Sequence, residues 1–183
     1  MVLFKIQIQK DSQMKKTVMA MVLTAGIGMA VEVGTVPPKV TLSGAQGGRT
    51  DGTPWISSSL KGKVHILFYV DPDKKDLNEA LSKRLKKRHF DRSRYGSVAI
   101  VNLAATWMPN MLIEKKLKSK QKEFPDTTYV KDKKKVLVDK WQLADDNSDI
   151  LLFDKKGKLI YKKFGKLSDV EIKKVITLIE KNL

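Results

Sequence analysis

The sequence has no cysteine, and this absence excludes several kinds of chemistry at once. Thiol–disulfide exchange requires a thiolate that attacks sulfur, and disulfide bonds, cysteine-ligated zinc and iron–sulfur clusters require the same side chain. Histidine is nearly as scarce: His65 lies in an apolar segment and His89 near the end of a basic one. Neither has a second ligand at metal spacing, so we predict no metal site and no cofactor.

The familiar catalytic motifs are also lacking. The sequence contains no G-x-S-x-G nucleophile elbow, no Walker-type phosphate loop and no dinucleotide fingerprint. We therefore assign no catalytic residue. An enzyme with thiol-independent chemistry, for example metal-assisted hydrolysis by carboxylates, stays open as an alternative.

Long hydrophobic runs are few, and the one from Val18 to Ala30 is too short to span a bilayer as a helix. Two lysines precede it, and Gly28 and Ala30 close it with small side chains. A positive start, an apolar stretch and small residues at the −3 and −1 positions are typical of a secretory signal peptide. A buried core helix is the alternative, although threonine and glycine within the run disfavour it.

We accordingly predict that residues 1–30 are a signal peptide, cleaved after Ala30, and that residues 31–183 form a single domain in the periplasm. No transmembrane anchor would remain after cleavage. Residues 1–13 are then either an extended n-region or the product of an upstream start codon, with Met14 as the true start.

The sequence contains few acidic residues. It has 20 acidic and 36 basic side chains, which gives a net charge of +16. A charge of this sign favours polyanionic partners such as nucleic acid, anionic lipid or acidic protein. The densest basic patch comprises Lys83, Arg84, Lys86, Lys87, Arg88, Arg92 and Arg94. It is either a solvated helix face or a polyanion-binding surface. Nucleic acid is a poor candidate, because no aromatic residues alternate with the basic ones and export would remove the protein from the chromosome.

Apolar patterning predicts alternating strands and helices. Buried strands are expected over 64–70 and 97–103, and a helix from near Asp73 to His89. A second helix, with Met108, Met111, Leu112 and Leu117 towards the core, should end at Phe124-Pro125. Short strands are expected over 129–130 and 136–138, and a hairpin over 150–161. Ser168 and Glu171 form a capping box for a last helix. This order predicts an α/β sandwich with a mixed central sheet.

The order of these segments, with Phe153–Lys158 before the last helix, resembles the thioredoxin-like superfamily. The chain resembles more closely the YtfJ family of small exported proteins, in motifs that span most of residues 33–183. Those motifs are Gly62-Lys63-Val64, Ile100-Val101-Asn102, Trp141-Gln142-Leu143 with Asp145-Asp146-Asn147-Ser148, and Leu152–Gly157. The resemblance implies a thioredoxin-like α/β/α sandwich, and the family carries no established activity.

The chain departs from redox thioredoxins in two places. Asp73 and Asp76 fall near the positions of the two thiols, and Ser148 lies near the position of the proline that precedes the hairpin strand. The resemblance therefore implies a non-redox binding or accessory module. Its partner would be an envelope protein or an anionic ligand whose identity the sequence does not give.

By analogy with the substrate-binding edge of thioredoxins, the candidate binding edge comprises Asp71, Asp73, Asp76, Thr106, Trp107, Ser148 and Asp149. The aspartates have three interpretations: they complement the positive start of a helix, they hold a hard cation, or they line a polar docking edge. Trp107 and the nearby methionines either form an adaptable apolar docking surface or begin a core-facing helix. Trp55, Trp141 and His65 are interpreted as packed residues.

Overall fold

The centre of the fold is β4 (Val64–Val70), which has the bounds that its apolar run predicts. In the computed structural model, which describes residues 30–183, β4 pairs in parallel with β5 (Tyr95–Asn102) and antiparallel with β7 (Ser148–Phe153). The sheet continues through β6 (Thr127–Asp132), β2 (Gly47–Arg49) and β8 (Leu159–Phe164). Its order is β2-β6-β5-β4-β7-β8, in which the β4–β5 and β5–β6 pairs are parallel and the other neighbouring pairs are antiparallel.

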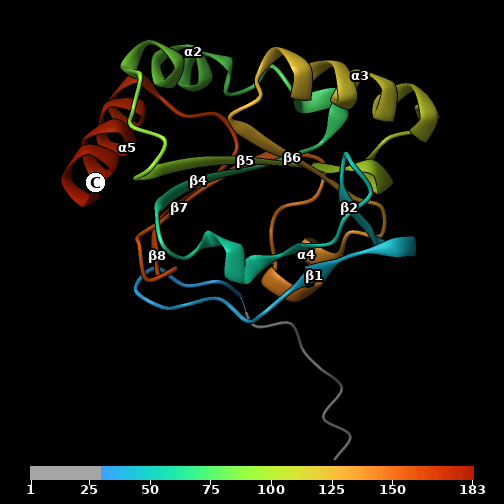
Figure 1. The fold of residues 1–183 in the computed structure, drawn as a ribbon, viewed down its shortest axis with the longest axis horizontal. Helices are drawn as coiled ribbons and strands as arrows, with labels where there is room; N and C mark the ends of the chain where they lie inside the picture. The colour runs from blue at the N-terminus through green and yellow to red at the C-terminus, as the bar shows by residue number, and fades with distance from the viewer. Residues whose placement is uncertain (1–29) are drawn as a thin grey trace, which may run out of the picture.

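Helices cover both faces of this mixed sheet, as the sequence predicts. Figure 1 shows α2 (Glu79–Arg88), α3 (Asn110–Glu123) and α5 (Asp169–Asn182) on one side. The short α4 (Val136–Trp141) lies on the other side, with β1 (Thr41–Leu42), which pairs with β3 (Trp55–Ile56) in a separate two-stranded sheet. The largely irregular segment 31–63 covers this second face, with Val31, Val40, Leu42, Trp55 and Leu60 in its core.

Each face has its own hydrophobic core. Alternate β4 residues face opposite sides, so Ile66 packs with the α2 and α5 residues Leu81 and Ile176, whereas Leu67 packs with Trp55 and Trp141. Both tryptophans are fully buried, which confirms their interpretation as packed residues. The apolar face of α5 is buried as predicted, and the capping box of Ser168 and Glu171 is present in both directions.

The predicted signal peptide lies outside the described residues, except for Ala30. The described chain begins the fold immediately afterwards: Val31 is buried, and its amide donates to the Trp141 carbonyl at 3.1 Å. Within residues 30–183, no helix combines the length and the apolar character that crossing a membrane demands.

Three expectations for the secondary structure are wrong. The helix expected from near Asp73 starts at Glu79, because residues 72–74 form a separate 3-10 turn. Residues 136–138 begin α4 and not a strand, because Asp132 accepts hydrogen bonds from the amides of Val136 and Leu137 and holds the chain in a helical turn. These local carboxylate contacts outweigh the strand preference of the valines.

The third correction concerns the orientation of α3, whose end before Pro125 is as predicted. Leu117 is buried as predicted, beside Ile113 and against Leu103, and Met108 packs against the same cluster. Met111 and Leu112 are 79% and 52% exposed, so they do not face the core. Trp107, just before the helix, is 89% exposed and does not begin a core-facing helix either.

Candidate functional site

Polar side chains end all three parallel strands at one edge of the sheet. Asp71 follows β4, Asn102 ends β5, and Asp132 ends β6, while β7 begins at the same edge with Ser148 and Asp149. We call these five residues the polar edge cluster. All five are buried, with at most 1% exposure. Buried polar groups at the carboxyl ends of parallel strands are where α/β folds commonly place their ligand sites.

Asp71 is held by the loop that precedes β7. Its Oδ2 accepts a hydrogen bond from the Asn147 amide at 2.7 Å, and its own amide donates to the Asn147 carbonyl at 2.9 Å. Burial raises the pKa of this carboxyl to about 6, against the lowering effect of the Asn147 amide. Asp71 therefore gains a proton in the range of mildly acidic solutions.

Asp149 lies on the same face of the sheet, opposite Tyr69 in the β4–β7 register. Its Oδ2 accepts from the Ala144 amide at 2.8 Å. Burial, with a smaller contribution from the negative charge of Asp71, raises the pKa of Asp149 to about 7. Within the described residues, the Oδ1 atoms of Asp71 and Asp149 are both buried without a hydrogen-bond partner. This pair of carboxyls is thus poorly solvated in its charged form.

Asp132 has a structural role in the cluster. Besides the amides of α4, it accepts a hydrogen bond from the Tyr69 hydroxyl at 3.2 Å. Burial raises the pKa of Tyr69, so this phenol stays protonated and acts as the donor. The contact ties the centre of the sheet to the start of α4.

Asn78 supports the cluster from the helical side of the sheet. Its amide nitrogen donates to the Ser148 carbonyl, the Ser148 hydroxyl and the Gly165 carbonyl at 3.1–3.2 Å, and its oxygen accepts from the Leu167 amide at 2.9 Å. Asn78 is the N-cap residue of α2, but its side chain makes no capping bond. It instead fixes the start of β7 and the end of β8.

An exposed rim of charged residues surrounds the buried cluster. Asp145 accepts from the Asn102 amide at 3.1 Å and forms an ion pair with Lys135. Asp146 is paired with Lys74 at 3.8 Å. Asp146 and Lys135 both have positive φ values, which non-glycine residues rarely adopt. The rim therefore presents charges of both signs on a backbone held in unusual conformations.

The structure brings only part of the predicted binding edge together. Asp71, Ser148 and Asp149 are buried together at the end of the sheet where β4 pairs with β7. Asp73 and Asp76 are exposed on the turn between β4 and α2, and within residues 30–183 neither caps that helix. Thr106 accepts from the Met108 amide at 3.2 Å and, like Trp107, has no hydrogen bond to the cluster in the described part of the chain.

Sequence reasoning missed Asn78, Asn102 and Asp132. The signal for two of them is present: Asn102 and Asp132 follow apolar strand segments in the same way as Asp71 does. Asn78 gives no such signal, because its partners lie 70 to 89 positions away.

The chemistry available at this site is limited. The carboxyls of Asp71 and Asp149 titrate near neutral pH, yet both are fully buried, so no substrate reaches them in this conformation. Among residues 30–183, no group of three or more acidic or histidine side chains is arranged to hold a metal ion. His65 is buried as expected, and desolvation lowers its pKa.

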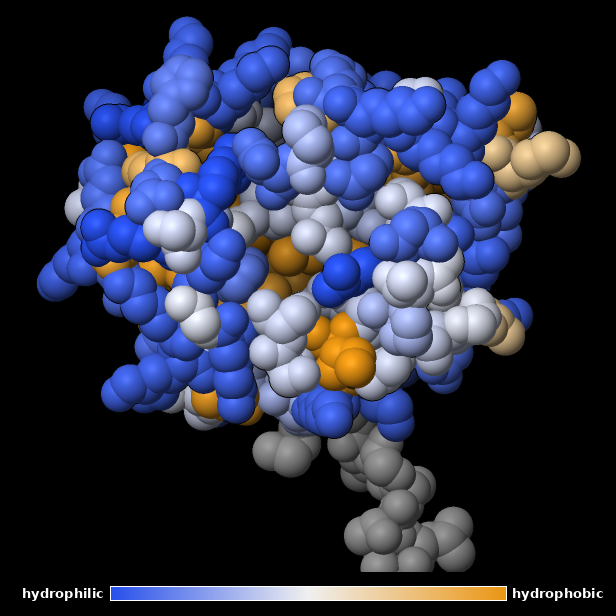
Figure 2. Space-filling model, in the orientation of Figure 1, coloured by the Kyte–Doolittle hydropathy of each residue, from blue (hydrophilic) through white to orange (hydrophobic). Residues whose placement is uncertain are grey.

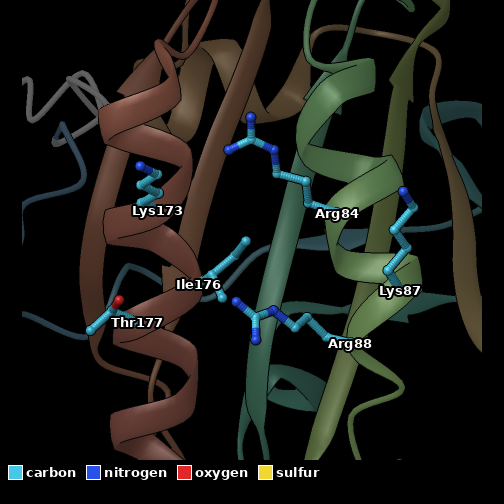
Figure 3. Close-up of a pocket in the computed structure, with 6 residues that line it drawn as sticks. All are labelled: Arg84, Lys87, Arg88, Lys173, Ile176 and Thr177. Carbon is cyan, nitrogen blue, oxygen red and sulfur yellow. The ribbon is translucent and has the colours of Figure 1, made fainter.

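The basic patch on and after α2 is largely engaged in ion pairs. Arg84 and Arg88 reach across to α5, where they pair with Asp169 at 2.6 Å and Glu180 at 3.2 Å. Figure 3 shows these two arginines in the groove between the helices, about 480 Å³ in volume, with Ile176 facing them. Lys83 pairs with Glu79 and Arg92 with Asp126; within residues 30–183, Lys86, Lys87 and Arg94 have no carboxylate partner. Four of the seven cations thus already have a counter-charge.

A mixed sheet with β4 and β5 parallel, an antiparallel hairpin and helices on both faces defines a thioredoxin-like fold. The exposed lipoprotein thioredoxin of Streptococcus pneumoniae has this fold: its crystal structure matches with a TM-score of 0.56 at 14% identity, over 79% of this chain and 99% of that one. Within the fold, residues 45–182 match the family described as "Bacterial protein of unknown function (YtfJ_HI0045)". The chain belongs to this YtfJ family, which confirms the resemblance drawn from its motifs.

Two uncharacterized relatives support the same assignment. A protein of Haemophilus influenzae is 32% identical over 129 residues, which cover 69% of this chain and 70% of the relative. The YtfJ protein of Escherichia coli is 30% identical over 132 residues, which cover 70% and 72% of the two chains.

Proposed function

We propose that this protein is a non-redox, thioredoxin-like binding module of the periplasm that docks an envelope protein at its polar edge. The supporting observation is the polar edge cluster itself. Asp71 and Asp149 are buried at the end of the sheet, where the backbone amides of Asn147 and Ala144 donate hydrogen bonds to their carboxyls. A rigid polar edge of this kind suits recognition better than turnover, because its carboxyls are shielded from substrate.

The rim around the cluster supports a polypeptide partner. Asp145 is paired with Lys135 and Asp146 with Lys74, so both signs of charge are present on the rim. Complementary charges of this kind fix orientation and favour the right partner over others.

Site-specific photo-crosslinking in the native host would test the docking edge. A photoreactive amino acid is placed at Asp73 or Asp146, both exposed on the rim. The matched control is Lys156, which is exposed in the β7–β8 turn at the opposite end of the sheet. Discrete crosslinked products from the two rim positions and none from Lys156 are expected. Identical products from all three positions, or none from any, would contradict docking at this edge.

The periplasmic location rests on the pattern of residues 14–30 and needs its own test. Intact mass after fractionation of the native host should give a periplasmic species that begins at Val31. A full-length species in the cytoplasm would overturn the proposed export, and the unpaired basic residues would then become candidates for nucleic-acid binding.

A further inference from the structure

The residues that lead into α3 form an unusually exposed apolar tip. Trp107, Met111 and Leu112 are 89%, 79% and 52% exposed. Seven large hydrophobic side chains are exposed in residues 30–183, and these three fall within six positions of one another. Single exposed apolar residues are common, but a cluster of large ones indicates contact with another apolar phase or surface.

The outer face of α3 continues from this tip as a row of lysines. Met111, Lys115, Lys118 and Lys122 follow the spacing i, i+4, i+7 and i+11, so they share one side of the helix. All four are exposed, on the side opposite the buried Ile113 and Leu117. The helix therefore presents an apolar first turn followed by three cations in line.

These cations have no counter-charge of their own. Glu114 is turned towards Lys131 and Lys133 of β6 and its loop, and Glu123 pairs with Lys120. Within the described chain, Lys115, Lys118 and Lys122 make no ion pair with a carboxylate. Lys86 of α2 and Lys120 both lie over the ring of Phe124, at 4.9 and 5.0 Å, on the side of α3 away from this row.

The shape of this surface is visible in the figures. α2 and α3 lie on the same side of the sheet in Figure 1. In the same orientation, Figure 2 shows hydrophilic side chains along that side, with apolar side chains projecting at the end where α3 begins. The apolar residues thus project outward and do not line a pocket.

We propose that α3 and its leading residues 107–112 form a peripheral docking surface for an anionic lipid membrane. Tryptophan prefers the boundary between head groups and acyl chains, and Met111 and Leu112 supply further apolar area for shallow insertion. Lys115, Lys118 and Lys122 would face the negative head groups, where each lysine adds about fivefold to the affinity. A projecting apolar tip next to unpaired lysines fits a lipid surface better than an acidic protein. An acidic protein partner would need pockets that accept the projecting apolar side chains.

Vesicle sedimentation with the proposed mature protein, residues 31–183, tests this surface. The protein is mixed with phosphatidylcholine vesicles, with and without phosphatidylglycerol, at low and high salt. We expect binding only with phosphatidylglycerol, and weaker binding at high salt. The triple variant K115Q/K118Q/K122Q should lose on the order of a hundredfold in affinity. Its matched control, K173Q/K174Q/K181Q on α5, removes the same net charge from exposed positions and should lose far less.

Trp107 provides an independent reporter of insertion, because Trp55 and Trp141 are fully buried. Brominated phospholipid should quench the fluorescence of the bound protein, and Trp107→Ala should abolish that quenching. Three outcomes would overturn the proposal: no binding to anionic vesicles, equal losses in the two triple variants, or binding without quenching of Trp107. Failure of this test leaves the docking edge of the proposed function untouched, because the two use different residues and probes.

Discussion

Replacing Asp149 by asparagine should make the protein more stable at neutral and alkaline pH. The pKa of Asp149 is raised from 3.8 to about 7, chiefly by burial. Its folded state binds the proton more tightly than the unfolded state does. This contribution to stability is therefore fully present below about pH 4 and is lost as the pH rises through about 7.

The size of the effect follows from the pKa shift. Each unit corresponds to about 1.4 kcal/mol, so Asp149 should lower the free energy of unfolding by roughly 4 kcal/mol between about pH 4 and pH 8. Asparagine retains an oxygen that accepts from the Ala144 amide, and its side chain carries no charge at any pH. We expect Asp149→Asn to remove most of this pH dependence and to be more stable than the wild type at pH 8.

Urea unfolding followed by tryptophan fluorescence, at several pH values, measures this prediction. Asp146→Asn is the matched control, since the same substitution at a 70% exposed side chain should leave the pH profile unchanged. The reasoning would be refuted if Asp149→Asn kept the wild-type slope, or if it lost stability equally at low and high pH.

Three further substitutions test the supports of the fold. Asn78→Ala removes four hydrogen bonds within the interior and should cost roughly 2–4 kcal/mol in urea unfolding. Gly96→Ala would place a Cβ 2.4 Å from the His65 ring, so its melting temperature should fall, and His65→Ala in the same chain should restore part of it. Ser168→Ala breaks the capping box of α5 and should cost about 1 kcal/mol; no change in thermal melting would argue against this cap.

Sequence patterns predicted correctly those elements that are stabilised by residues close together in the chain. β4 shows an uninterrupted apolar run, and the last helix shows both a capping box and a continuous apolar face. The turn over 154–158 likewise predicts the β7–β8 hairpin, because Asp154 accepts from amides on the far side of the turn. In each case the stabilising contacts lie within a few positions along the chain.

Prediction failed where distant contacts decide the local structure. The start of α2 is displaced because Asn78 is committed to Ser148 and Leu167 instead of to its own helix. α3 buries the predicted Leu117, but packing against Leu103 places Ile113 beside it and leaves Met111 and Leu112 in solvent.

The sequence indicates individual residues of the candidate site but not how they come together. Asp71 and Asp149 are singled out by sequence, but the pairing that buries them depends on the antiparallel register of β4 and β7. No pattern in either segment encodes that register. The sequence also does not show that Asp132 caps α4. The valines at 136 and 138 favour a strand, and the contact between Asp132 and the amides of Val136 and Leu137 forms only in the folded turn.

The first described residues of the chain depend on contacts with residues near its other end. The Gly34 amide donates to the Leu159 carbonyl and the Leu159 amide to the Thr35 carbonyl, both at 2.8 Å. Val31 and Leu42 likewise belong to a core completed by Phe153 and Leu159. Leu42 finds its strand partner Trp55 early, whereas the partners of Gly34 and Thr35 lie about 125 positions further along the chain. Closing this contact is therefore a long-range step with a high entropic cost. A chain that ends before β8 cannot complete the second core.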